Sequence, residues 1–191
     1  AEVAAARACA ATVGGLLAAV RPHEVAAREC AAEAPGVRDA AAVLTWHPPA
    51  AVELCGSLAD GTSVSGAAVA GQTPGVDLAL RMPRACFLAK DHLNHKYGDK
   101  RALYLAVVLR TLRAHPAFAA AELGHAGAGG PAGARPVVTV PPSRALGLRG
   151  PLQIIPHAGH DGLARSKLLP SRSNLRAAGD GEAAPTPRYN N

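Results

Sequence analysis

The chain has 191 residues, a net charge of +6 at neutral pH, 49% hydrophobic residues and 3% aromatic residues. This length allows one core with a small extension, the hydrophobic content excludes a disordered chain, and the positive charge favours an anionic partner such as RNA. No apolar run reaches the ~18 residues of a membrane span, and the four widely spaced cysteines lack the close pairs of zinc sites, so we expect no membrane, no metal and no cofactor.

The first half of the chain alternates between helical and extended patterns. Residues 2–33 carry Leu and Val at helical spacing, which predicts one or two helices with breaks near Gly14-Gly15 and Pro22. Strands are predicted at 43–46, 52–55 and 76–80, and a short helix is predicted to follow Ser57.

The second half contains the strongest helical pattern, over residues 90–113. Residues 124–135 form a Gly- and Ala-rich segment that is typical of a loop, and strands are predicted at 136–140 and 152–155. The order of elements indicates an α/β (α+β) fold with a small mixed sheet flanked by helices. We expect an N-terminal helical segment at 1–40, a domain at 41–169 and a basic extension at 170–191, which leads to a further domain.

Gly56-Ser57 and Asp77 form a pattern that is typical of the palm of nucleotidyltransferases. The glycine lets a phosphate approach the backbone, and a helix that begins there supplies free N–H donors. A Gly-Ser pair alone is an ordinary turn in most proteins. The pattern gains weight from Gly61-Thr62 and from the carboxylate on the next predicted strand.

The remaining carboxylates of a palm are missing from the predicted strands. Two metal ions need carboxylates at positions i and i+2, which point to the same face of a strand, and here the second position is Ala79. A third carboxylate would come from a neighbouring strand, but 136–140 and 152–155 contain none, and Glu122 is expected in a loop. We therefore predict a structural role for Asp77, as hydrogen-bond acceptor from a backbone N–H or from Ser57.

Basic residues gather in two places. His92 and His95 lie at positions i and i+3 of the predicted helix, but further zinc ligands are lacking. His92, Lys96 and Lys100 share a helical face by i+4 spacing, which is compatible with phosphate binding and with a solvated cationic stripe. From residue 141 onward seven Lys or Arg stand against three Asp or Glu, and the same two interpretations apply.

Several strings together resemble the Nrap (nucleolar protein 6) family. Two of them are quite specific: Asp77-Leu78-Ala79 with Met82-Pro83, and Lys-Asp-x-Leu-Asn at 90–94. The others lie at 55–58, 61–62, 100–105, 168–176 and 185–190, in the order of the family. The first forty residues and the Gly-rich segment match nothing specific. Residues 58–60 are more polar than is usual in the family.

The resemblance implies the N-terminal part of a larger protein with repeated nucleotidyltransferase-like and helical domains. Such a protein belongs to the small-subunit processome in the nucleolus of the nucleus, where its partners are pre-ribosomal RNA and other processome proteins. The family is thought to have lost catalysis, and Ala79 is the family's own state.

The leading hypothesis is therefore a catalytically inactive scaffold domain in ribosome biogenesis and rRNA processing. Gly56, Ser57 and Asp77 would form a degenerate nucleotide or phosphate site. RNA or phosphate contacts are expected from the basic residues of the 90–101 segment and the tail, namely Lys90, Lys96, Lys100, Arg101, Arg172 and Arg176. The alternatives are an active nucleotidyltransferase in which Asp60 or Asp91 replaces a missing ligand, and a module that binds nucleotides without chemistry.

Overall fold

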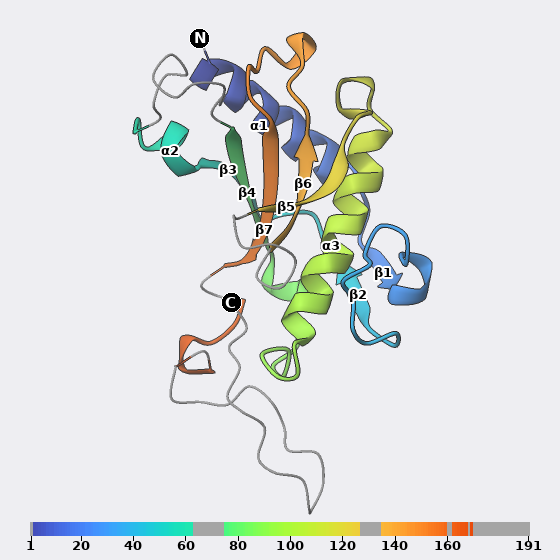
Figure 1. The fold of residues 1–191 in the computed structure, drawn as a ribbon. Coiled ribbons are helices and arrows are strands. Elements are labelled where there is room, and N and C mark those ends of the chain that lie inside the picture. Colours follow the sequence, from blue (N-terminus) through green and yellow to red (C-terminus); the bar gives the residue numbers. More distant parts are fainter. Residues whose placement is uncertain (1, 63–74, 127–134, 160–161, 168, 170–191) are drawn as a thin grey trace, which may run out of the picture.

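The computed structural model describes residues 2–62, 75–126, 135–159, 162–167 and 169 (Figure 1). Its helices are α1 (Glu2–Ala18), α2 (Gly56–Ala59) and α3 (Lys96–Arg113). Its strands are β1 (His23–Ala26), β2 (Val43–Trp46), β3 (Ala51–Cys55), β4 (Val76–Met82), β5 (Glu122–Ala126), β6 (Arg135–Val140) and β7 (Leu152–Ala158). No helix within these ranges is long and apolar enough to cross a membrane.

Five strands form one mixed sheet in the order β3-β4-β7-β6-β5. The β4 and β7 strands run parallel, and the other neighbours in the sheet run antiparallel. A parallel pair needs a long crossover, and here α3, β5 and β6 lie between the two strands in sequence. The predicted α/β class with a small mixed sheet is confirmed.

Helices α1 and α3 cover one face of this sheet, which we call the helix side (Figure 1). Alternate residues of β4 are buried there, from Val76 to Met82, and Leu152 and Ile154 of β7 join the same core. The intervening residues of β4 and β7 are only partly buried, and they lie on the opposite face, which we call the open face.

Strands β1 and β2 form a separate antiparallel pair that packs on α3 (Figure 1). The Trp46 ring lies against the Tyr104 ring of α3 with centroids 4.3 Å apart. The Tyr104 hydroxyl donates to the His47 carbonyl at 3.2 Å. These contacts hold the pair against the helix, so α3 is buried over most of its length.

Two helix predictions need correction. α1 runs through Gly14-Gly15, and Gly14 lies against Val52, so the small residue permits close packing on β3. Of the one or two helices predicted over residues 2–33, one α-helix is present, because residues 23–26 form β1. The helix predicted at 90–113 begins only at Lys96, since Asn94 and His95 take left-handed φ values of 53° and 59° that a helix cannot continue.

The predicted Gly- and Ala-rich loop at 124–135 overlaps two strands. Strand β5 takes in residues 124–126 and β6 begins at Arg135, while 127–134 lie outside the described residues. Glu122 begins β5 and so does not lie in a loop as predicted. Because Gly124 has a weak strand propensity, the sequence pattern does not predict β5. A Cβ at Gly124 would come within 2.6 Å of Thr139 Oγ1, so pairing with β6 needs a small residue there.

Candidate functional site

The predicted Gly-Ser turn and acidic strand do meet at one end of the open face. Strand β3 ends at Cys55, whose register partner in β4 is Asp77, and α2 begins at Gly56. Gly56 has a left-handed φ of 73°, and a Cβ there would lie 2.7 Å from Asp77 Oδ2. Only glycine fits this turn without strain, because the carboxylate fills the space beside it.

The Asp77 carboxylate makes no hydrogen bond or ion pair with another described residue. The hydrogen bond expected from Ser57 is therefore not formed, and Ser57 is exposed. Burial raises the pKa of Asp77 above its ordinary value, since desolvation disfavours the charged form. The carboxylate is thus held in place by packing against Gly56.

The sheet register shows what surrounds the place of the missing second carboxylate. Ala79 stands between Glu53 of β3 and Ile155 of β7, while Gln153 of β7 stands beside Asp77. The parallel neighbour therefore offers an amide and an apolar side chain where a palm would have a carboxylate. Within the described ranges, no group of three or more His, Cys, Asp or Glu is arranged to hold a metal ion.

Two glutamates lie on the sheet, and one of them is Glu122, which the sequence pattern predicts in a loop. Glu53 projects from the same face as Ala79, diagonally from Asp77, and it is exposed. Glu122 is in register with Thr139 of β6, three strands away from β4, or about 14 Å at the usual strand spacing. Only the first of the two is a neighbour of Asp77.

The turn end of the open face is acidic. Burial raises the pKa of the Cys55 thiol, and the negative charges of Asp77, Asp60 and Glu53 raise it further. Three carboxylates therefore lie close enough to this thiol to raise its pKa. A phosphate placed there without a bound cation would meet like charges, so the arrangement on its own does not favour the phosphate site predicted at Gly56, Ser57 and Asp77.

The other end of β4 is basic. Arg81 stands in register with Ala51 of β3 and His157 of β7, and the three side chains leave the sheet on the open face. In the described part of the chain, Arg81 Nε is the buried side-chain nitrogen or oxygen that lacks a hydrogen-bond partner. The open face thus changes from acidic to basic along β4.

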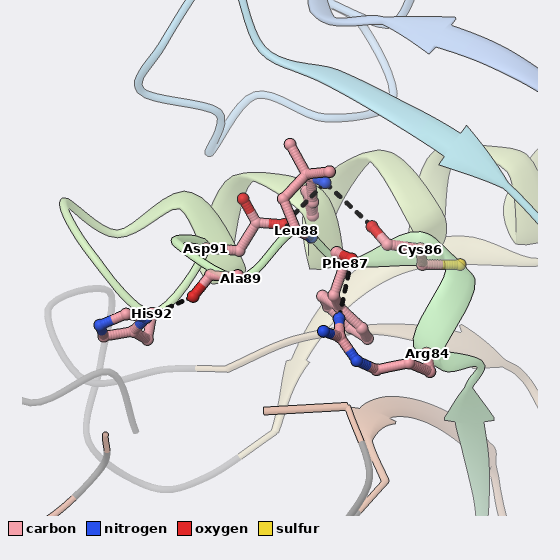
Figure 2. A network of polar contacts seen from close by, with 8 residues as sticks. Arg84, Cys86, Phe87, Leu88, Ala89, Asp91 and His92 are labelled. Carbon is pink, nitrogen blue, oxygen red and sulfur yellow. Dashed lines mark hydrogen bonds and ion pairs between the residues drawn. The ribbon is translucent and has the colours of Figure 1, made fainter. Parts of the chain in front are cut away.

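On the helix side, Asp91 is the centre of a buried polar network (Figure 2). This aspartate is 2% exposed, and its Oδ2 accepts from the Leu88 N–H at 2.6 Å and pairs with Lys100 Nζ at 2.7 Å. Lys100 also donates to the Cys86 carbonyl at 2.9 Å. His92 Nδ1 lies 3.1 Å from the Ala89 carbonyl. The network fastens the segment before α3 to the first turns of the helix.

Burial of this network corrects the predicted cationic face. Lys100 and Arg101 are 9% and 8% exposed, so neither belongs to a solvated stripe. The Arg101 Nε donates to the Pro156 carbonyl of β7 at 2.8 Å. His92 precedes α3, so it shares no helical face with Lys100. Asp91 is equally unavailable as a replacement metal ligand.

Of the predicted RNA contacts, Lys90 and Lys96 are exposed. Arg172 and Arg176 lie outside the described residues. The string at 90–94 has a structural explanation, because its aspartate carries the buried ion pair and Asn94 takes a left-handed conformation that asparagine tolerates.

Comparison with known proteins identifies the chain. A family model described as Nrap protein domain 1 matches residues 24–191. The chain belongs to the Nrap family. The match begins within β1 and takes in both the Gly56 turn and the Asp91 network, which confirms the family inferred from the sequence strings.

Relatives of this Nrap domain are named nucleolar protein 6 in several animals. The Homo sapiens protein is 33% identical over 158 residues, which cover 75% of this chain and 12% of the relative. The Drosophila virilis protein is 35% identical over 130 residues, covering 68% and 10%. The Xenopus tropicalis protein is 30% identical over 155 residues, covering 75% and 12%. The chain spans about a tenth of the length of these curated relatives.

Proposed function

We propose that this Nrap chain is a catalytically inactive, nucleotidyltransferase-like scaffold domain of a nucleolar protein. It supports ribosome biogenesis within the small-subunit processome by contacts with pre-ribosomal RNA and with processome proteins. One observation carries the proposal: Ala79 replaces the second carboxylate beside Asp77, and the neighbouring strand supplies Gln153 and Ile155. A palm without these ligands cannot hold two magnesium ions.

The nucleolar location is supported by the family, since the relatives in insects, frogs and human all bear the name nucleolar protein 6. The net charge of +6 suits an RNA partner in that compartment. In this proposal residues 41–169 form the nucleotidyltransferase-like unit, with α1 packed on β3. Residues 170–191 lead to further domains of a longer protein.

The absence of catalysis is tested with purified protein, Mg²⁺, labelled ATP and an RNA primer, beside an active poly(A) polymerase. We expect no primer extension by the Nrap chain. Measurable extension that Asp77→Asn abolishes would overturn the pseudoenzyme assignment. It would favour the alternative of an active enzyme in which exposed Asp60 supplies a missing ligand.

RNA binding is tested separately by fluorescence anisotropy at increasing salt. We expect affinity for single-stranded RNA that falls steeply with salt, because phosphate contacts release counterions. An affinity that does not depend on salt, or no affinity, would shift the proposal to protein contacts alone.

A second candidate, a module that binds nucleotides without chemistry, is favoured by the left-handed turn at Gly56, which a phosphate can approach. Thermal stabilisation of the chain by ATP with Mg²⁺, lost in Ser57→Ala, would support this candidate. We expect no such stabilisation, because three carboxylates lie close to the thiol beside this turn.

A further inference from the structure

On the open face, the Arg81 side chain has a buried hydrogen-bond donor, its Nε, that lacks a partner among the described residues. A buried donor without a partner costs free energy comparable to a lost hydrogen bond, so native proteins rarely leave one unsatisfied. The described ion pairs use other cations, namely Arg28, Lys100, Arg110 and Arg149.

An imidazole stands directly beside Arg81. His157 is its register partner on the parallel strand β7, so both side chains leave the sheet on the open face about one strand spacing apart, roughly 4.8 Å. The His157 Nδ1 lies 3.2 Å from the Ala158 carbonyl. Since a carbonyl only accepts, this contact places a proton on Nδ1, and Nε2 can donate to a ligand only when the ring carries a second proton.

Arg84 follows β4 and adds a second positive charge near the same end of the sheet. Its guanidinium donates to the Phe87 carbonyl at 2.9 Å (Figure 2). The centroids of the Phe87 and Tyr97 rings lie 6.0 Å apart. The Tyr97 hydroxyl accepts from the Ala158 N–H, next to His157. This chain of contacts connects Arg84 with the carboxyl end of β7.

An anion would be directed to this end of the sheet by the charges along β4. The turn end carries Asp77 and its acidic neighbours, which repel an anion, and the basic end is two positions beyond Ala79. Glu53 is the nearest carboxylate by register, diagonal to Arg81, yet it forms no ion pair with it. No described residue therefore occupies the Arg81 guanidinium, and its Nη groups, which are not among the buried unpartnered atoms, are the donors that a ligand can reach.

We propose that Arg81, with His157 beside it and Arg84 at the edge, binds a backbone phosphate of RNA at the carboxyl ends of β4 and β7. The guanidinium suits this role because its fork of N–H donors matches two oxygens of one phosphate. The proposal rests on the proposed function in that RNA supplies the phosphate. It places RNA contact at the opposite end of β4 from the degenerate turn.

The test compares RNA binding by the complete chain and by Arg81→Gln, using a fluorescent single-stranded RNA at several salt concentrations. We expect about tenfold weaker binding and a salt slope smaller by about one, as for the loss of one phosphate contact. His157→Gln should weaken binding in the same direction, and Arg81→Lys should keep the slope while losing part of the affinity.

The matched control is Arg28→Gln, which removes the same charge from an 82% exposed side chain near the two-stranded pair. It should bind RNA as the parent chain does. If Arg81→Gln binds no more weakly than this control, the Arg81 site is wrong while the proposed RNA function stands; a carboxylate of a protein partner would give that result. If the parent chain binds no RNA, the Arg81 proposal fails and the proposed function is left with protein contacts alone.

Two further measurements test whether each variant is folded and whether free phosphate competes with RNA. Circular dichroism checks that each variant is folded, and if Arg81→Gln is not, His157→Gln and Arg84→Gln decide in its place. Inorganic phosphate, added at constant ionic strength, should not displace the RNA, because a single site holds free phosphate weakly. Displacement at low phosphate concentration, together with thermal stabilisation by phosphate of the parent chain but not of Arg81→Gln, would assign the site to free phosphate and overturn the RNA assignment.

Discussion

The charged groups on the two sides of the five-stranded sheet differ in whether they have hydrogen-bond or ion-pair partners. On the helix side every buried charged residue in the described part of the chain has a partner: Asp91 pairs with Lys100, Asp99 accepts from the Arg38 N–H at 2.9 Å, and Arg101 donates to a β7 carbonyl. On the open face, neither the Asp77 nor the Arg81 side chain has a hydrogen-bond or ion-pair partner among the described residues. This difference is the reason for placing the proposed ligand site on the open face, since the fold already supplies partners for the buried charges of the helix side.

The largest effect should come from breaking the Asp91 network. Asp91→Ala leaves Lys100 buried without its counter-ion, which typically costs about 3–5 kcal/mol. Denaturation by urea, followed by circular dichroism, measures the loss. Lys90→Ala, at the exposed neighbouring position, should change stability by less than about 0.5 kcal/mol. Equal losses in the two variants would remove the contrast between the two sides of the sheet.

The Gly56 turn offers a sharper comparison, because Gly61 has nearly the same backbone conformation. Their φ values are 73° and 70°, but a Cβ at Gly56 would lie 2.7 Å from Asp77 Oδ2, whereas nothing lies within 4 Å at Gly61. Gly61→Ala should therefore cost only the left-handed strain, about 1 kcal/mol. Gly56→Ala adds the steric conflict, so its total should be about 2–3 kcal/mol.

Adding Asp77→Ala to Gly56→Ala tests the cause of that difference. The double variant should recover the stability of Gly61→Ala, since only the strain remains. Thermal unfolding of the parent chain, Gly56→Ala, Asp77→Ala and the double variant measures the cycle, with Gly61→Ala as the reference for strain alone. If Gly56→Ala costs no more than Gly61→Ala, the Asp77 carboxylate moves aside freely, and the turn end of the open face is less fixed than its packing indicates.

The strands were more predictable from the sequence than the helix ends. Alternating apolar residues identify β4 and β7 because each strand buries one face. The pattern at 90–95 predicts helix where the structure has turns, because its residues suit a helix, while the ion pair of Asp91 with Lys100 and the left-handed Asn94 and His95 favour the turns. The sequence does not distinguish β1 from a second helix, since its short apolar pattern lies close to a long helical one.

The turn end of the site was predictable, and the basic end was not. Gly56 and Asp77 follow from local patterns, because each lies at a strand that can be recognised alone. The neighbours Glu53 and His157 depend on register between strands far apart in sequence, which no local pattern fixes. The burial of Lys100 and Arg101 was missed for the same reason, since charges at helical spacing ordinarily face solvent.

The smallest expected effect concerns the charge of Asp77. Burial raises the pKa of this carboxyl in the folded state, so the folded chain binds the proton more tightly than the unfolded chain does. The charged form therefore lowers stability, and this loss develops as pH rises from below the ordinary carboxyl pKa to above the raised one. Asp77→Asn should remove the loss and match the parent chain only at acidic pH.

The gain for Asp77→Asn at neutral pH should stay below about 1 kcal/mol, because solvent screens a half-exposed group. Urea denaturation at pH 7 and at pH 3 measures it. Glu24→Gln removes the same charge from the exposed side of β1, and it sets the effect of net charge alone on this basic chain. If Asp77→Asn is instead less stable than the parent chain at pH 7, the carboxylate has a favourable partner. The carboxylate at the acidic end of the open face would then have a partner, as the buried charges of the helix side do. Arg81 alone would remain as evidence for a ligand site on the open face.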